Sequence, residues 1–124
     1  TVWRIKAGDS SMVAQQNSGD LSRITLDQVF QGARANDGVC LSVIRDTAKY
    51  LGMALSNLAA TLDPEVIVLG GMIATSGDML LEAIRLECAR RLGPAQAEHL
   101  RIVLSPLGHD AAAIGAARLA SEPR

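Results

Sequence analysis

The sequence has few aromatic residues, with Trp3, Phe30 and Tyr50 as the only three in 124 residues. Single-stranded nucleic-acid sites usually stack bases on several aromatic rings, so no such platform is expected. Charge of one sign is also lacking, because 12 Lys and Arg residues balance 13 Asp and Glu residues to a formal net charge of −1. A near-neutral chain lacks the basic footprint of a nucleic-acid-binding domain, and we expect no nucleic-acid contact by this segment.

Cysteine is equally scarce. Cys40 and Cys88 are the only two, and neither stands at metal-ligand spacing from another Cys or His. We interpret both as small buried side chains of a reducing compartment, which favours a cytoplasmic location. No apolar run reaches the roughly 18 residues of a membrane span, and no signal-peptide pattern or starting Met is found. We therefore expect no membrane partner, and we expect these residues to belong to a longer protein.

The strongest pattern that the chain does contain is a helical one. Apolar residues make up 48% of the sequence, and in residues 38–62 they recur at spacings of three and four, which predicts one long helix. Gly52, Ser56 and Ala60 form a second row of small residues on it. Because a helical Gly costs about 1 kcal/mol against Ala, we expect another backbone to approach there. The second half of the helix is apolar almost all round and is predicted to be deeply buried.

The residues before this helix divide into two parts. Residues 1–24 are polar and rich in turn signals, so we interpret them as a connecting segment. A lobe segment over residues 25–124 follows. It begins with a helix at about 26–35, for which Thr25 and Gln28 stand in capping-box positions.

After the long helix the pattern is strand, helix, strand and helix. Strands are predicted at 65–69 and 100–105, and helices at about 77–92 and 110–121. The β-branched run of the first strand is typical of a parallel strand buried on both faces. Expected N-caps are Thr75 or Ser76, and Asp110. The predicted fold class is therefore α/β and helix-rich, with a right-handed parallel βαβα unit.

Two candidate binding loops follow the strands, since ligands of open parallel sheets bind outside the carboxyl ends of the strands. Gly70 and Gly71 follow the first strand and have no Cβ to block a ligand. His109 and Asp110 follow the second strand. The diglycine matches neither a dinucleotide fingerprint nor a P-loop, so an ordinary turn remains an alternative for it. A helix cap beside a surface histidine remains the alternative for the second loop.

Three stretches of this sequence resemble the carboxyl-terminal part of the ROK family of repressors, open reading frames and sugar kinases. They are Tyr50-Leu51-Gly52 with Asn57-Leu58, Leu62-Asp63-Pro64-Glu65-Val66-Ile67-Val68-Leu69-Gly70-Gly71, and Leu107-Gly108-His109-Asp110-Ala111. In order and spacing the likeness covers about residues 25–120. It implies the actin-like, ribonuclease-H-like ATPase fold, of which this chain would be a segment of the carboxyl-terminal lobe.

The resemblance also implies a ligand. Gly70 and Gly71 would approach the adenosine part of ATP, and Met72 would add apolar contact near the purine ring. The parent would then be a kinase that phosphorylates glucose or a related hexose. The family's phosphate motif, catalytic-base segment and zinc motif are absent from this sequence. Zinc and Mg are therefore expected in the parent only, with no catalytic residue and no metal ligand here. Phosphoryl transfer needs those parts, so we expect the segment alone to be inactive.

Two other functions remain open. ROK transcriptional repressors share this region and would use it for effector sensing and dimerisation. An upstream helix-turn-helix would favour a repressor, whereas an upstream Asp-x-Gly-Gly-Thr would favour a kinase. The third alternative is a packing module, because the apolar second half of the long helix predicts a homo-oligomer.

Overall fold

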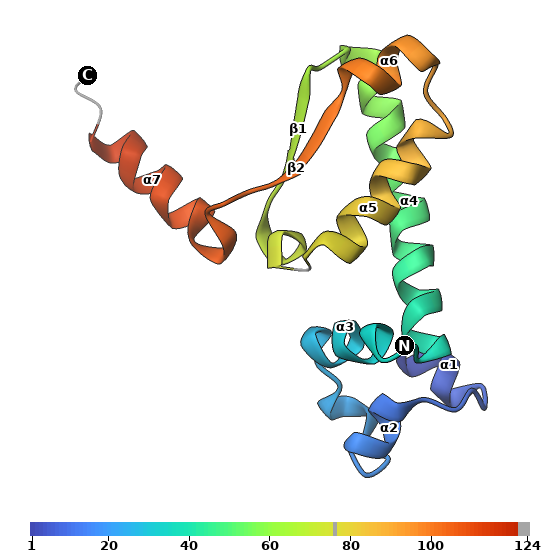
Figure 1. Ribbon diagram of the computed structural model, residues 1–124. Coiled ribbons are helices and arrows are strands. Elements are labelled where there is room, and N and C mark those ends of the chain that lie inside the picture. Colours follow the sequence, from blue (N-terminus) through green and yellow to red (C-terminus); the bar gives the residue numbers. More distant parts are fainter. Residues whose placement is uncertain (76, 122–124) are drawn as a thin grey trace. The chain divides into compact units, whose positions relative to one another are not determined.

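The computed structural model describes residues 1–75 and 77–121, except for the side chains of Met72, Thr75 and His109 (Figure 1). The chain divides into two compact units, Thr1–Tyr50 and Leu51–Arg124. Helix α4 (Gly38–Leu62) contributes residues to both, and its bounds are those predicted from sequence. Within the described residues, no helix combines the length and the apolar character that a bilayer crossing requires.

The first unit consists of short helical segments followed by the start of α4. They are α1 (Val2–Lys6), α2 (Met12–Gln16), η1 (Leu21–Arg23) and α3 (Leu26–Arg34). The predicted capping box of α3 is confirmed, because Thr25 and Gln28 each accept a hydrogen bond from the other's backbone N–H. Helix α2 packs against α3, and Val13 of α2 is fully buried. The expected division of the chain after residue 24 stays a prediction.

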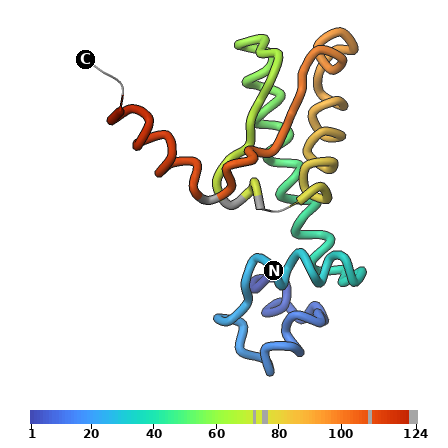
Figure 2. Tube along the Cα trace, turned by 60° about the vertical axis from the view of Figure 1, so that its left-hand side comes forward, coloured from blue at the N-terminus to red at the C-terminus, as the bar shows by residue number. Residues whose placement is uncertain are grey.

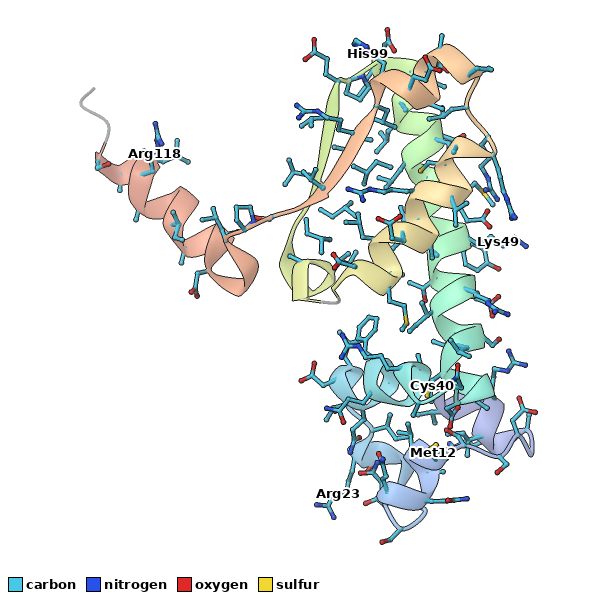
Figure 3. All side chains as sticks on the ribbon, in the orientation of Figure 1. Met12, Arg23, Cys40, Lys49, His99 and Arg118 are labelled. Atoms are coloured by element: carbon cyan, nitrogen blue, oxygen red, sulfur yellow. The ribbon has the colours of Figure 1, made fainter. Side chains whose placement is uncertain are left out.

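The buried carboxylate of Asp37 joins α2 to the start of α4. Its Oδ2 accepts from the Ser11 hydroxyl at 2.8 Å and from the Met12 backbone N–H at 2.6 Å. Its Oδ1 accepts from the Cys40 backbone N–H at 3.0 Å, which caps α4. Burial acts to raise the pKa of Asp37, but these hydrogen bonds, together with one from the Cys40 side chain, outweigh it and hold the pKa below the usual 3.8. Met12 and Cys40 are labelled in Figure 3.

In the second unit, α5 (Asp78–Ala89) crosses α4 at Gly52. A Cβ built on Gly52 would lie 2.5 Å from Glu87 Cβ and 3.4 Å from the Cys88 backbone nitrogen. The Cys88 thiol donates to the Gly52 carbonyl oxygen at 3.4 Å. The prediction that another backbone approaches the small-residue row at Gly52 is therefore confirmed, and that backbone belongs to α5. Ala59 rather than Ala60 continues the buried row, because Ala60 is exposed.

The predicted deep burial of the second half of α4 is wrong. Leu55 is 8% exposed, but Leu58 is 49% and Leu62 is 69% exposed. The reason is geometric: α5 covers the side of α4 that carries Gly52, and the described residues leave Leu58 and Leu62 about half or more exposed. The apolar stripe is therefore only half covered in this chain.

The sheet has two parallel strands, β1 (Val66–Leu69) and β2 (Arg101–Leu104), which lie side by side in Figure 2. Helix α5 connects them and contacts β2, so the predicted parallel βαβ order is confirmed. The prediction that β1 is buried on both faces is wrong. Val66 is 38% and Val68 is 55% exposed, whereas Leu69 is buried. Among the described residues, only one face of this narrow sheet is covered.

The remaining differences concern helix ends. The apolar spacing of residues 77–92 predicts a buried face made of Leu80, Leu81, Ile84, Cys88 and Leu92. The first four are buried, whereas α5 ends at Ala89 and Leu92 lies beyond it, partly exposed. Gly77, with φ 74°, is its N-cap instead of Thr75 or Ser76, and no side chain caps it; Ser76 lies outside the described residues. A helix that was not predicted, α6 (Pro94–His99), begins at Pro94, because Pro fits the first helical turn. Asp110 lies in η3 (Gly108–Asp110), directly before α7 (Ala111–Ser121).

The crossing at Gly52 yields a test of stability. Gly52→Ala is expected to lower the free energy of unfolding by about 1–2 kcal/mol, because overpacking against α5 exceeds the helix-propensity gain. The matched control is Gly115→Ala in α7, where a Cβ meets nothing within 4 Å and no loss is expected. Urea unfolding measures both. Equal effects at the two positions would contradict the close approach.

The Asp37 network yields a pH dependence. Because its pKa is lowered in the folded state, its contribution to stability is present above pH 3.8 and is lost as the pH falls through the lower folded value. Asp37→Asn is expected to cost about 1–2 kcal/mol at neutral pH, because the amide NH2 group that replaces one oxygen cannot accept hydrogen bonds from buried donors, and to flatten the stability profile below pH 4. Asp46→Asn, at an exposed position of α4, is the control. Denaturant melts from pH 2 to 7 measure the profile, and an unchanged slope would refute this assignment.

Candidate functional site

The carboxyl ends of the two strands lie next to each other. Leu69 pairs with Leu104 in the parallel register, and the Ser105 N–H donates to the Leu69 carbonyl oxygen at 2.8 Å. The segments that follow, η2 (Gly71–Thr75) and η3, contact one another. The two loops that the sequence singled out are therefore neighbours at one edge of the sheet, where parallel sheets bind ligands.

The diglycine is open to the surface. Gly70 and Gly71 are exposed, and a Cβ built on either would meet nothing within 4 Å. Gly71 has φ 64°, a left-handed conformation that favours glycine, so the turn itself explains Gly71. Neither a positive φ nor a steric contact accounts for Gly70. A ligand that closely approaches the backbone is another reason for a glycine, and this reason remains possible at Gly70.

The second loop is built around a hydroxyl-stabilised turn. The Ser105 hydroxyl accepts from the Leu107 backbone N–H at 3.2 Å, and the Asp110 N–H donates to the Leu107 carbonyl oxygen at 3.1 Å. Gly108 adopts φ 52°. Asp110 is exposed, while the side chains of His109 and Met72 lie outside the described part of the chain. The structure therefore brings the two backbones together without describing those two side chains.

The charges at this edge favour a neutral ligand group over a phosphate. Asp78 lies in the first turn of α5, and Asp110 lies in η3. A carboxylate in the first turn occupies the region where helix amides would otherwise attract an anion. The sequence analysis did not single out Asp78. It expected the helix to be capped by Thr75 or Ser76, and only a helix that begins after Gly77 puts Asp78 in the first turn.

Metal chemistry finds no support in the described residues, which contain no group of three His, Cys, Asp or Glu side chains able to hold an ion. Cys40 and Cys88 are both buried, as predicted. Burial raises the pKa of each thiol, and the neighbouring Asp37 raises that of Cys40 further. The residues present thus do not fit zinc or Mg, and no step is assigned through either metal.

The described fold agrees with a segment of an actin-like ATPase lobe, the fold that the family resemblance implies and that solved ROK sugar kinases share. Helix-rich α/β order, a parallel strand pair and an open diglycine after the first strand are its marks. A ROK family model matches residues 6–123, and the chain therefore belongs to the ROK family.

Similarity to individual proteins extends to both branches of the family. The chain is 40% identical over 92 residues to a glucokinase of Halalkalibacterium halodurans, covering 74% of this chain and 28% of that protein. It is 26% identical over 120 residues to a xylose repressor of Bacillus spizizenii, covering 97% of this chain and 31% of the repressor. The chain thus spans less than a third of the length of either relative.

A solved structure with the same fold is a ROK family glucokinase from Streptomyces griseus in complex with glucose and AMPPNP. It superposes with a TM-score of 0.81 at 26% sequence identity, covering 94% of this chain and 38% of that one. The predicted family and fold class are thereby confirmed. The assignment of Gly70, Gly71 and Met72 to a nucleotide stays a prediction.

Proposed function

We propose that this chain forms the adenosine side of the nucleotide cleft of a ROK sugar kinase that phosphorylates glucose or a related hexose with ATP. The observation that carries the proposal is the open backbone at Gly70 beside the exit of the neighbouring strand. Similarity to glucokinases supports it, and the Streptomyces griseus enzyme was solved with an ATP analogue and glucose.

Each residue of the proposed site has a limited role. The backbones of Gly70 and Gly71 would lie against the adenosine, since neither carries a side chain that keeps a flat ring away. Met72 would add apolar contact at the ring. ATP supplies the phosphoryl group that is transferred, and this chain's residues only bind and orient the neutral end of that nucleotide. The carboxylates of Asp78 and Asp110 discourage the phosphates from turning toward this edge.

Substitution at Gly70 tests the proposal. Gly70→Val places a side chain in open space without a φ penalty, so the fold should be retained while the ligand is excluded. Because the chain supplies only one side of the cleft, we expect a dissociation constant of about 1 mM, which corresponds to a binding free energy of about −4 kcal/mol. Nuclear magnetic resonance titration of the chain with adenosine and with AMPPNP is therefore the measurement. Both ligands should shift the amides of residues 69–75 and 105–110 with similar affinity, and the variant should weaken both about tenfold.

Gly93→Val is the matched control, because Gly93 is equally open and its φ is −65° but it precedes α6. It should bind as the unchanged chain does. The proposal fails if Gly70→Val binds normally, or if adenosine shifts no amide at these two loops. Tight binding of AMPPNP without binding of adenosine would instead indicate a phosphate site, contrary to the charges described above.

A transcriptional repressor is the second candidate. The alignment with the Bacillus spizizenii xylose repressor extends over 97% of this chain, whereas the Halalkalibacterium halodurans glucokinase alignment covers 74%. In that case the segment would take part in sensing a sugar effector and in dimerisation. The coding sequence upstream of Thr1 discriminates: a helix-turn-helix supports the repressor, and an Asp-x-Gly-Gly-Thr motif supports the kinase.

Self-association is proposed for either function. Leu58 and Leu62 are 49% and 69% exposed on α4, and apolar surface of this kind is normally covered. The 124-residue chain is therefore expected to form a homo-oligomer, and light scattering at micromolar concentration measures its mass. A monomeric mass would contradict this expectation.

A further inference from the structure

The two outer edges of the sheet differ in how their backbone groups are satisfied. The N–H groups of Arg101 and Ser105 donate to Glu65 and Leu69, toward β1. Successive peptide groups of a strand point to opposite sides, so the carbonyl of Ile102 points away from β1, to the outer edge of β2. An unpaired carbonyl on such an edge is a template for another strand.

Arg85 of α5 covers this carbonyl. Its Nε and Nη2 atoms donate to the Ile102 carbonyl oxygen at 3.0 and 2.6 Å. A third donor, Nη1, bonds to Glu82 Oε1 at 2.6 Å and fixes the guanidinium from the other side. The contact therefore uses the planar fork of the arginine, which a lysine cannot reproduce.

The surroundings of Arg85 include a cleft. A cleft of about 340 Å³ runs beside β2, and Arg85 is part of its wall. Its other lining comes mainly from α5, α6 and β2: Cys88, Leu92, Ala97, Leu100 and Val103. At the other edge of the sheet, no described side chain makes a hydrogen bond to the outward backbone groups of Val66 or Val68.

We propose that Arg85 is an edge guard, which closes the outer edge of β2 against strand addition and leaves only the β1 side of the sheet open. The consequence concerns assembly. Uncovering the β2 edge gives the two-stranded sheet a second edge at which copies of the chain can pair, and a sheet with two open edges allows contacts that propagate without end. The inference does not depend on nucleotide binding.

The test compares two arginine substitutions in the 124-residue chain. Arg85→Ala uncovers the Ile102 carbonyl and widens the cleft. Arg90→Ala removes the same charge at the end of the same helix, where the exposed Arg90 side chain is paired with Glu87 and no hydrogen bond to β2 is found among the described residues. Sedimentation velocity over a concentration series measures the mass of each variant.

Arg85→Ala is expected to raise the weight-average mass at least about twofold over the unchanged chain and to keep raising it with concentration. Arg90→Ala should sediment as the unchanged chain does. Equal behaviour of the two variants, whether both assemble or neither does, overturns the proposal. If Arg85→Ala loses its helical circular dichroism, the same comparison is made under the same criteria with Arg85→Met, which keeps an aliphatic side chain in the cleft wall and has no donor for the Ile102 carbonyl.

Discussion

The contact between α4 and α5 at Gly52 is the constraint on which the second unit depends. A parallel strand pair needs a crossover, and the crossover must pack on the sheet and on a support behind it. With no side chain at Gly52, the backbone of α5 at Glu87 and Cys88 comes within van der Waals distance of α4. That approach holds α5 where Arg85 reaches the Ile102 carbonyl. One missing Cβ thus influences both the strand pairing and the closed edge of the sheet.

The geometry of the candidate site also depends on the packing of α5 against α4. Once β1 and β2 are parallel and in register, their carboxyl ends must meet at one edge, and the loops after them become neighbours. The two glycines there have different reasons: Gly71 satisfies a left-handed turn, while Gly70 leaves open space. An ordinary turn therefore accounts for Gly71 but not for Gly70.

Much of the fold follows from local patterns. The bounds of α4, the capping box at Thr25 and the buried face of α5 depend on spacing within one element, and the sequence contains that information. The predicted burial of Leu58, Leu62 and Val68 was wrong. An apolar side chain is more stable when buried, but the local sequence does not show whether another element lies over it. The start at Gly77 was missed for a similar reason, since capping residues compete and backbone geometry decides between them.

Two polar contacts that the sequence did not predict join residues far apart in the chain. Ser11 meets Asp37, and Arg85 meets the backbone of Ile102. Spacing rules cannot find such pairs, because the partner is fixed by how elements pack and, for Ile102, is a carbonyl that every residue possesses. At the candidate site the same limit applies in a milder form. The sequence located Gly70 and Gly71, but only the register of the strands shows which loop shares their edge, and hence that Asp110 and Asp78 set its charge.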